Sequence, residues 1–293
     1  MASRAVRSHT AKPRSPQTPH VALFLLDEFR LFVDGQHVAP SMCAQRLLAY
    51  LALTGGRLRS VVACALWPDV LDAQALASLR TAIWRADRCA NGIVSRGGSS
   101  VALAGFVTVD VADLVRHASQ LLGSATSNPG GHCSDVVQVT PELVAGFGGR
   151  SELLPGWHDD WVECERERLR LLRLHALEAA SSRMLRLGRF SSALEAALEA
   201  VRSEPLRETA HRAVIEVHLA EGNAAEAVSA FRRYRSLLGD HLGLQPSEQF
   251  VAWLNAQLSH ARCNDSGSNR SRSTPLLGRS GLAPGGRRGA AGS

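Results

Sequence analysis

Lysine is almost missing from the sequence: 32 of the 33 basic side chains are arginine, and Lys12 is the single lysine. A phosphate-binding loop of the Gly-Lys-Ser/Thr type is therefore absent, and its lysine would be needed to contact nucleotide phosphates. No Gly-x-Ser-x-Gly sequence is present, so the nucleophile turn of an α/β-hydrolase is missing too. These absences argue against an ATPase and against a common class of serine hydrolase.

Metal sites and membrane segments are also missing. No two of the six cysteines have the short spacing of a zinc site, and no histidine pairs with a cysteine or aspartate at ligand spacing. No apolar run reaches membrane-spanning length, and no signal-peptide core follows the basic N-terminus. We therefore expect no cofactor, no metal, no membrane partner and a cytoplasmic protein.

The net charge of +6 comes from the two ends of the chain. Residues 1–20 carry +4 and residues 261–293 carry +5, whereas residues 21–260 sum to −3. Basic tails can raise non-specific affinity for DNA, but solvated disordered segments have the same composition. The segment 41–109 carries +4 within the acidic middle, and this local excess is the charge pattern relevant to nucleic acid.

The sequence pattern of residues 21–110 predicts strands, then helices, then a β-ribbon. Short apolar runs predict strands over residues 21–26, 29–33, 36–39, 93–94, 101–103 and 107–109. Asp34-Gly35 favours a hairpin between the second and third of these, because glycine tolerates positive φ. Amphipathic patterns predict helices over residues 43–54, 60–66 and 72–89. With Asp72 as the N-cap of the third helix, this order is that of a winged helix-turn-helix.

The remainder predicts helices with an internal repeat. The patterns predict a helix over residues 110–122, a Gly- and Ser-rich loop over 123–139 and a short helix over 140–147. From Trp157 to about residue 260 they predict an almost continuous series of helices. Gly188 and Ala193 recur 34 residues later as Gly222 and Ala227. This period and these small residues are typical of tetratricopeptide repeats.

The third predicted helix is the main candidate for nucleic-acid contact. Once its apolar face is removed, the outward side chains are Ser78, Arg80, Thr81, Trp84, Arg85 and Arg88. Arginine can bond guanine O6 and N7 together, and threonine can touch a thymine methyl or a phosphate. Arg46 and Arg59 could clamp phosphates, and Arg96 could enter a minor groove from the wing. An ordinary solvated helix face is the alternative, and Trp84 could equally pack against the sheet.

The segment Trp157-His158-Asp159-Asp160-Trp161, with Glu163 and Glu165, looks at first like an acid–base or metal cluster. The acids, however, stand in the first turn of a long predicted helix, where negative charge is favoured and Asp160 with Glu163 matches a capping arrangement. We therefore expect the two tryptophans to dock this helix, and a hydrolase built on Asp159 and Asp160 is only a distant alternative.

Taken together, several segments resemble the Streptomyces antibiotic regulatory proteins, which join an OmpR-like winged helix to a bacterial transcriptional activation domain. The supporting segments are residues 45–53, 65–69, 79–85, 153–161, 165–168, 197–211 and 218–223. The resemblance covers about residues 21–260. Two departures are Ser78, where the family usually has asparagine, and the longer Gly-rich loop at 123–139. Neither an ATPase module nor a preceding receiver domain is expected.

We therefore predict a mainly α fold with small β elements, an N-terminal winged helix-turn-helix and a C-terminal tetratricopeptide-like all-α helical-repeat domain. The predicted parts are a disordered basic arm at 1–20, the OmpR-like winged helix at 21–110, a connecting helix and flexible loop at 111–152, the bacterial transcriptional activation domain at 153–260 and a disordered basic tail at 261–293.

The resemblance implies a non-enzymatic, sequence-specific activator of an antibiotic or secondary-metabolite gene cluster. Such a protein would bind direct repeats in double-stranded DNA near promoters, as a homodimer on DNA, and recruit RNA polymerase. The alternative from another class is a tetratricopeptide-like protein–protein scaffold whose winged helix does not bind DNA. The steep salt dependence of phosphate contacts would separate the two.

Overall fold

The computed structural model describes residues 19–125, 146–147 and 151–268 of the 293-residue chain. The chain divides into two compact units, Met1–Val214 and Ile215–Ser293. The division falls inside a helix of the repeat region and away from the connecting segment predicted at 111–152. Three predicted segments lie largely outside the described residues: the basic arm up to residue 18, the Gly-rich loop beyond residue 125 and most of the short helix at 140–147.

The first unit opens with a four-stranded sheet in the order β3-β2-β1-β7. Its strands are β1 (Val21–Phe24), β2 (Arg30–Val33), β3 (Gln36–Val38) and β7 (Val107–Val109). The predicted hairpin is present, because Asp34 and Gly35 both adopt positive φ, 50° and 79°. The strand predicted at 107–109 follows the ribbon strands in the sequence but does not join them. It instead pairs in parallel with β1, which brings the start of the next helix beside the end of β1.

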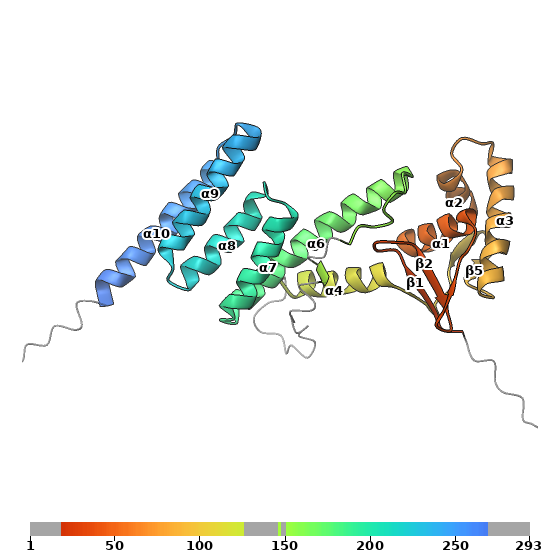
Figure 1. Ribbon diagram of the computed structural model, residues 1–293, viewed down its shortest axis with the longest axis horizontal. Helices are drawn as coiled ribbons and strands as arrows, with labels where there is room; N and C mark the ends of the chain where they lie inside the picture. The colour runs from red at the N-terminus through yellow and green to blue at the C-terminus, as the bar shows by residue number, and fades with distance from the viewer. Residues whose placement is uncertain (1–18, 126–145, 148–150, 269–293) are drawn as a thin grey trace, which may run out of the picture. The chain divides into compact units, whose positions relative to one another are not determined.

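Three helices follow the hairpin with nearly the predicted bounds: α1 (Met42–Thr54), α2 (Arg59–Leu66) and α3 (Asp72–Cys89). Leu47, Leu48 and Leu51 of α1 are buried, and Gly55 ends this helix with φ 73°. Helix α3 packs against both α1 and α2, and Figure 1 shows it beside them. The N-cap of α3 is Leu71, so the prediction of Asp72 as N-cap is wrong by one residue.

A second sheet, in the order β4-β6-β5, forms the wing. Its strands are β4 (Arg57–Leu58), β5 (Val94–Gly97) and β6 (Ser100–Leu103). Strands β5 and β6 make the predicted ribbon around Gly98, which has φ 53°. Strand β4 has no period-2 pattern because it holds only two residues, and the sequence did not predict it. The helices and the wing together make a winged helix-turn-helix.

Three helices complete the first unit up to the repeat region: α4 (Asp110–Ala125), α6 (Asp160–Arg186) and α7 (Phe190–Ser203). Helix α4 and helix α7 each pack against α6. The buried positions of α7 are all alanine: Ala193, Ala196, Ala197 and Ala200. Side chains this small let two helix backbones approach closely, so the alanines set the distance between α6 and α7.

The repeat region continues with α8 (Glu208–Ala220), α9 (Ala224–Leu242) and α10 (Glu248–Ser268). Helices α7 and α9 begin 34 residues apart, as the repeat predicted. Gly188 and Gly222 both have positive φ, 70° and 82°. Each glycine is the C′ residue of a Schellman motif, with the next residue's N–H bonded to Met184 O at 2.9 Å and His218 O at 2.8 Å.

The predicted fold class, mainly helical with small N-terminal β elements followed by helical repeats, is confirmed. One boundary needs correction, because α10 continues to Ser268 and the disordered tail predicted from residue 261 does not begin there. Among the described residues, no helix combines the length and apolar character that a bilayer crossing requires.

The alanine face of α7 leads to a stability prediction. Replacing Ala197 by leucine inserts a larger side chain at a fully buried position and should lower the free energy of unfolding by about 1–3 kcal/mol. Urea unfolding followed by circular dichroism measures this. The matched control is Glu195→Leu on the exposed side of the same helix, expected to change stability by less than about 0.5 kcal/mol. Equal effects of the two substitutions would contradict the packing described.

Candidate nucleic-acid interface

Helix α3 is held by a narrow face of small and aliphatic side chains. Its buried residues are Ala75, Leu79, Ala82, Ile83 and Ala86, which recur at helical spacing and face the rest of the trihelical unit. The helix has one acid in its first turn, Asp72, and one base in its last, Arg88, which suits the helix dipole at both ends. This anchoring fixes which side chains stand on the opposite side.

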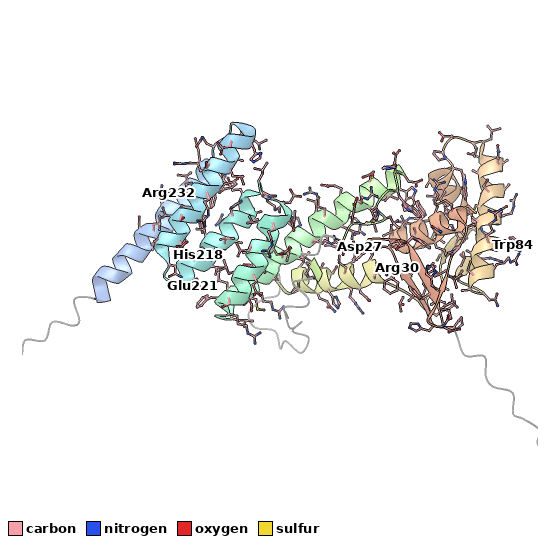
Figure 2. All side chains as sticks on the ribbon, viewed as in Figure 1. Asp27, Arg30, Trp84, His218, Glu221 and Arg232 are labelled. Carbon is pink, nitrogen blue, oxygen red and sulfur yellow. The ribbon has the colours of Figure 1, made fainter. Side chains whose placement is uncertain are left out.

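The opposite side of α3 is exposed and rich in arginine. Of the α3 residues predicted to contact DNA, five are exposed and Ser78 is half-buried; the exposed ones are Arg80, Thr81, Trp84, Arg85 and Arg88. Trp84 is 56% exposed and projects from the outer side of α3 (Figure 2), so it does not pack against the sheet. The guanidinium of Arg88 lies 5.1 Å from the centre of the Trp84 ring. Thr81 Oγ1 donates to Ala77 O at 3.2 Å.

Arg85 also reaches the first helix of the trihelical unit. Its Nη1 donates to Cys43 Sγ at 3.3 Å, and Ser41 Oγ lies 3.4 Å from the same sulfur. Partial burial acts to raise the pKa of the Cys43 thiol, but the hydrogen bonds of Ser41 and Arg85 and the charge of Arg85 outweigh it, so the pKa is lowered. Arg85 is therefore oriented by α1 while the residue itself is exposed.

The three arginines predicted outside α3 are in different situations. Arg96, on β5 of the wing, forms an ion pair with Asp87 of α3 and keeps 51% of its side chain exposed. Arg59 is half-buried, and its Nε has no hydrogen-bond partner among the described residues. Arg46 forms an ion pair with Asp159, with 26% of its side chain exposed. The pairs of Arg46 and Arg96 give both arginines a structural role that competes with DNA contact.

The acidic and aromatic segment at 157–165 docks the long helix, as predicted. The ring of Trp161 meets Tyr50 of α1 edge-on at 5.3 Å, and Trp157 stacks on Phe29 at 6.2 Å. Asp159 is the N-cap residue of α6, but no side-chain cap hydrogen bond forms, so the predicted capping by Asp160 and Glu163 is wrong. The Asp159 carboxylate accepts from Arg46 instead. Within the described residues, no group of acids, histidines and cysteines is arranged to hold a metal ion.

Asp110 is a structurally central residue that the sequence reasoning missed. Its carboxylate accepts hydrogen bonds from three backbone N–H groups: Leu25 at 3.0 Å, Leu26 at 3.0 Å and Val111 at 2.7 Å. Burial raises the pKa of this carboxyl more than the hydrogen bonds lower it. Nothing in the sequence indicated this role, because it depends on the parallel pairing of β1 with β7.

The end of β1 also pairs with the segment before α6. Leu26 and Leu153 form a β-bridge, Leu154 N donates to Leu25 O at 2.9 Å, and Asp27 N donates to Glu152 O at 2.7 Å. Asp27 and Leu154 both have positive φ, 67° and 46°, an uncommon conformation for residues other than glycine. We call residues 151–154 the docking segment, because this segment joins α6 to the N-terminal sheet.

Comparisons with known proteins agree with this arrangement. Residues 147–256 match the model of the bacterial transcriptional activator domain. The fold resembles that of EmbR from Mycobacterium tuberculosis, which was solved in complex with a low-affinity phosphopeptide. That match has a TM-score of 0.61 at 17% identity and covers 86% of this chain and 71% of the EmbR chain. No curated protein sequence matches the chain.

The contacts of Asp110 lead to a second stability prediction. Asp110→Ala leaves the N–H groups of Leu25 and Leu26 without their acceptor and should cost roughly 1–3 kcal/mol of unfolding free energy. The matched control is Asp113→Ala, in the same helical turn, where the side chain is 61% exposed and pairs with Arg116. Chemical denaturation of both variants measures the difference, and a loss no larger than that of the control would count against the role assigned to Asp110.

Proposed function

We propose that this chain is a transcriptional regulator of the Streptomyces antibiotic regulatory type, a sequence-specific DNA-binding activator with α3 as its recognition helix. The match of residues 147–256 to the bacterial transcriptional activator domain supports the family assignment. The observation that carries this proposal is the exposed face of α3, where Arg80, Thr81 and Arg85 are presented outward from a winged helix-turn-helix.

The chemistry of this face suits the major groove of DNA. Arg80 and Arg85 can each offer two parallel N–H donors to guanine O6 and N7, and the Thr81 methyl can meet a thymine methyl. Trp84 and Arg88 support each other through their cation–π contact and lie one to two turns from Arg80. Ser78 is half-buried, which favours a supporting contact over a base contact.

The wing and the trihelical unit supply the proposed backbone contacts. Arg96 stands on the wing with half of its side chain exposed, so it can reach a minor groove and the phosphates that border it while still paired with Asp87. Arg59 is half-buried at the start of α2, and its Nε is buried without a partner in the described part of the chain, so this side chain would have to turn outward to bind a phosphate. Arg46 is the weakest of the three candidates, because a phosphate would have to displace Asp159 from it.

The finer parts of the proposal follow from the family. We propose that the protein binds direct repeats near promoters as a homodimer on DNA, and that it controls a secondary-metabolite or antibiotic gene cluster. The bacterial transcriptional activator domain at 147–256 would then engage RNA polymerase. These regulators act by binding, so the proposal includes no catalytic step.

The test begins with selection of a preferred DNA sequence from random oligonucleotides, followed by gel-shift titration. Arg80→Ala and Arg85→Ala should each cost roughly 1–3 kcal/mol of specific binding, since each removes one bidentate base contact. The control is Arg116→Ala, an arginine of α4 with 59% of its side chain exposed. If both α3 variants bind as the control does, another surface reads the DNA.

Salt dependence separates this function from a protein–protein scaffold. Each phosphate contact releases counterions, so the logarithm of the binding constant should fall with the logarithm of salt concentration by about 0.9 per contact. Replacing a phosphate-binding arginine such as Arg96 removes one contact, so the steepness of this salt dependence should decrease by about 1. A full-length chain that selects no sequence and shows no salt-dependent DNA binding would favour the scaffold.

A further inference from the structure

A cavity of about 620 Å³ lies in the first unit, away from the proposed DNA-binding face. It is bounded by α6, by the end of α7 and by the docking segment. Its apolar lining comes from Phe147, Leu153, Leu169 and Leu174. This volume falls within the range of small-molecule sites, about 300–1,000 Å³.

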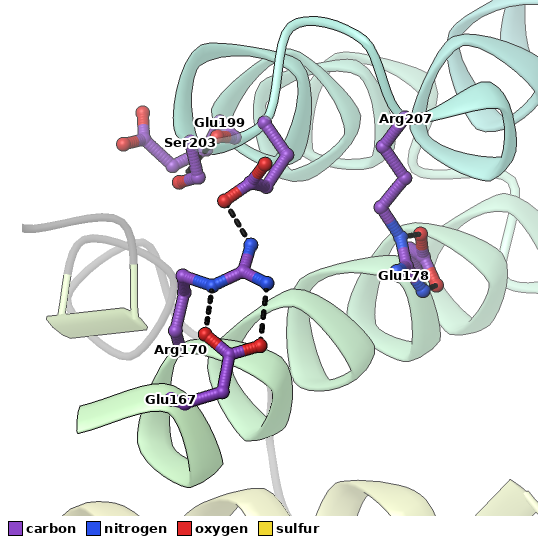
Figure 3. Close-up of polar contacts among 7 residues, drawn as sticks. Glu167, Arg170, Glu178, Glu199, Ser203 and Arg207 are labelled. Atoms are coloured by element: carbon purple, nitrogen blue, oxygen red, sulfur yellow. Dashed lines mark hydrogen bonds and ion pairs between the residues drawn. The ribbon is translucent and has the colours of Figure 1, made fainter. Parts of the chain in front are cut away.

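The polar lining of the cavity carries an excess of positive charge. Four arginines and two glutamates contribute to it: Arg166, Arg170, Arg173, Arg202, Glu152 and Glu199. Three of the arginines are already engaged by carboxylates. Arg170 is held by Glu167, as the dashed lines between these two labelled residues in Figure 3 show, and it also pairs with Glu204. Arg202 pairs with Glu199, and Arg166 pairs with Glu163.

Arg173 differs from the other three. Its Nη1 donates to Ser151 O at 2.6 Å, whereas its buried Nε and Nη2 have no hydrogen-bond partner within the described ranges. The carboxylates of Asp27 and Asp110 act on its charge from a distance, but within the described residues neither is hydrogen-bonded to it. Burial lowers the pKa of this guanidinium, as expected for a cation that has lost water without gaining a close anion. A buried donor left in this state is unfavourable. Arg173 also lines the cavity, so a turn of its side chain would offer these donors to an anion bound there.

From this combination we propose that the cavity is a binding site for a small amphipathic anion: an apolar ring system or chain that carries one carboxylate, sulfonate or similar group. The apolar body would lie on Leu169 and Leu174, and the anionic group would turn toward Arg173. A guanidinium fork matches a two-oxygen anion geometrically, so a carboxylate suits it better than a hydroxyl does.

The site is connected to the N-terminal sheet. Arg173 holds Ser151 O, and Arg166 holds Leu153 O at 2.8 Å together with Leu154 O. The same docking segment bonds to Leu25 and Asp27 at the end of β1. An anion on Arg173 therefore acts on the segment through which α6 contacts the winged helix, and binding should slow hydrogen exchange of the Leu154 and Asp27 amides.

The experiment uses two fluorescent probes with the same apolar body. The probe 8-anilinonaphthalene-1-sulfonate carries the anionic group, and N-phenyl-1-naphthylamine lacks it. Titrated into the full-length chain, the sulfonate should bind saturably to one site and more tightly than the neutral amine by about tenfold or more. The readout is probe fluorescence, and it needs no DNA, so its failure is separate from failure of the proposed function.

Variants of the chain identify the site. Arg173→Met keeps much of the side-chain volume but removes the charge, and it should abolish the preference for the sulfonate. Arg168→Met is the matched control, because Arg168 lies on the same helix, pairs with Glu165 and does not line the cavity. Ser203→Trp places an indole on the exposed rim and should block both probes while the fold is kept.

Circular dichroism checks that each variant is folded. If Arg173→Met does not fold, Ser203→Trp still tests whether the probes bind in this cavity. Equal affinity of the wild-type chain for the two probes would overturn the proposal. So would an unchanged preference for the sulfonate in folded Arg173→Met, unchanged binding of both probes in folded Ser203→Trp, or an absence of saturable binding to the wild-type chain.

Discussion

The candidate nucleic-acid interface depends on the narrow apolar face that anchors α3. Five small or aliphatic side chains, Ala75, Leu79, Ala82, Ile83 and Ala86, bury one side of the helix against α1 and α2. Because this face is narrow, the rest of the helix surface is exposed to solvent, and Arg80, Arg85 and Arg88 lie on that exposed surface. Burial of the apolar face therefore determines which side chains a partner meets. A wider apolar face would have buried Arg80 or Arg85 and removed the candidate interface.

Arginine has two uses in this chain, and the partners of each residue distinguish them. Arg46 and Arg166 are largely buried and bond to Asp159, Glu163 and backbone carbonyls, so they hold the docking segment and α6 in place. On α3 the exposed Arg80 belongs to the outward face. Arg173 belongs to neither group, because two of its buried nitrogens are without a bond in the described part of the chain. Partner and burial together, more than net charge, indicate where an external ligand is expected.

Local sequence patterns predicted much of the fold. The bounds of α3, the Asp34-Gly35 hairpin and the 34-residue repeat follow from helical periodicity and from glycine's tolerance of positive φ, which are properties of neighbouring residues. What was missed depends on contacts between distant residues. The parallel pairing of β7 with β1, the role of Asp110 and the partner of Arg46 have no local pattern. The exposed side of α3 was predictable, whereas the pairing of Arg46 and Arg96 with acids was not.

The most direct measurement of the central claim is site-specific photo-cross-linking to DNA. Trp84 projects from the middle of the outer face of α3, so a benzoylphenylalanine introduced there lies within reach of any duplex bound by this helix. If α3 is the recognition helix, a cross-link should form from position 84 to the selected DNA sequence and none from position 116 on α4. A cross-link from position 116 without one from position 84 would contradict the assignment of α3 as the recognition helix.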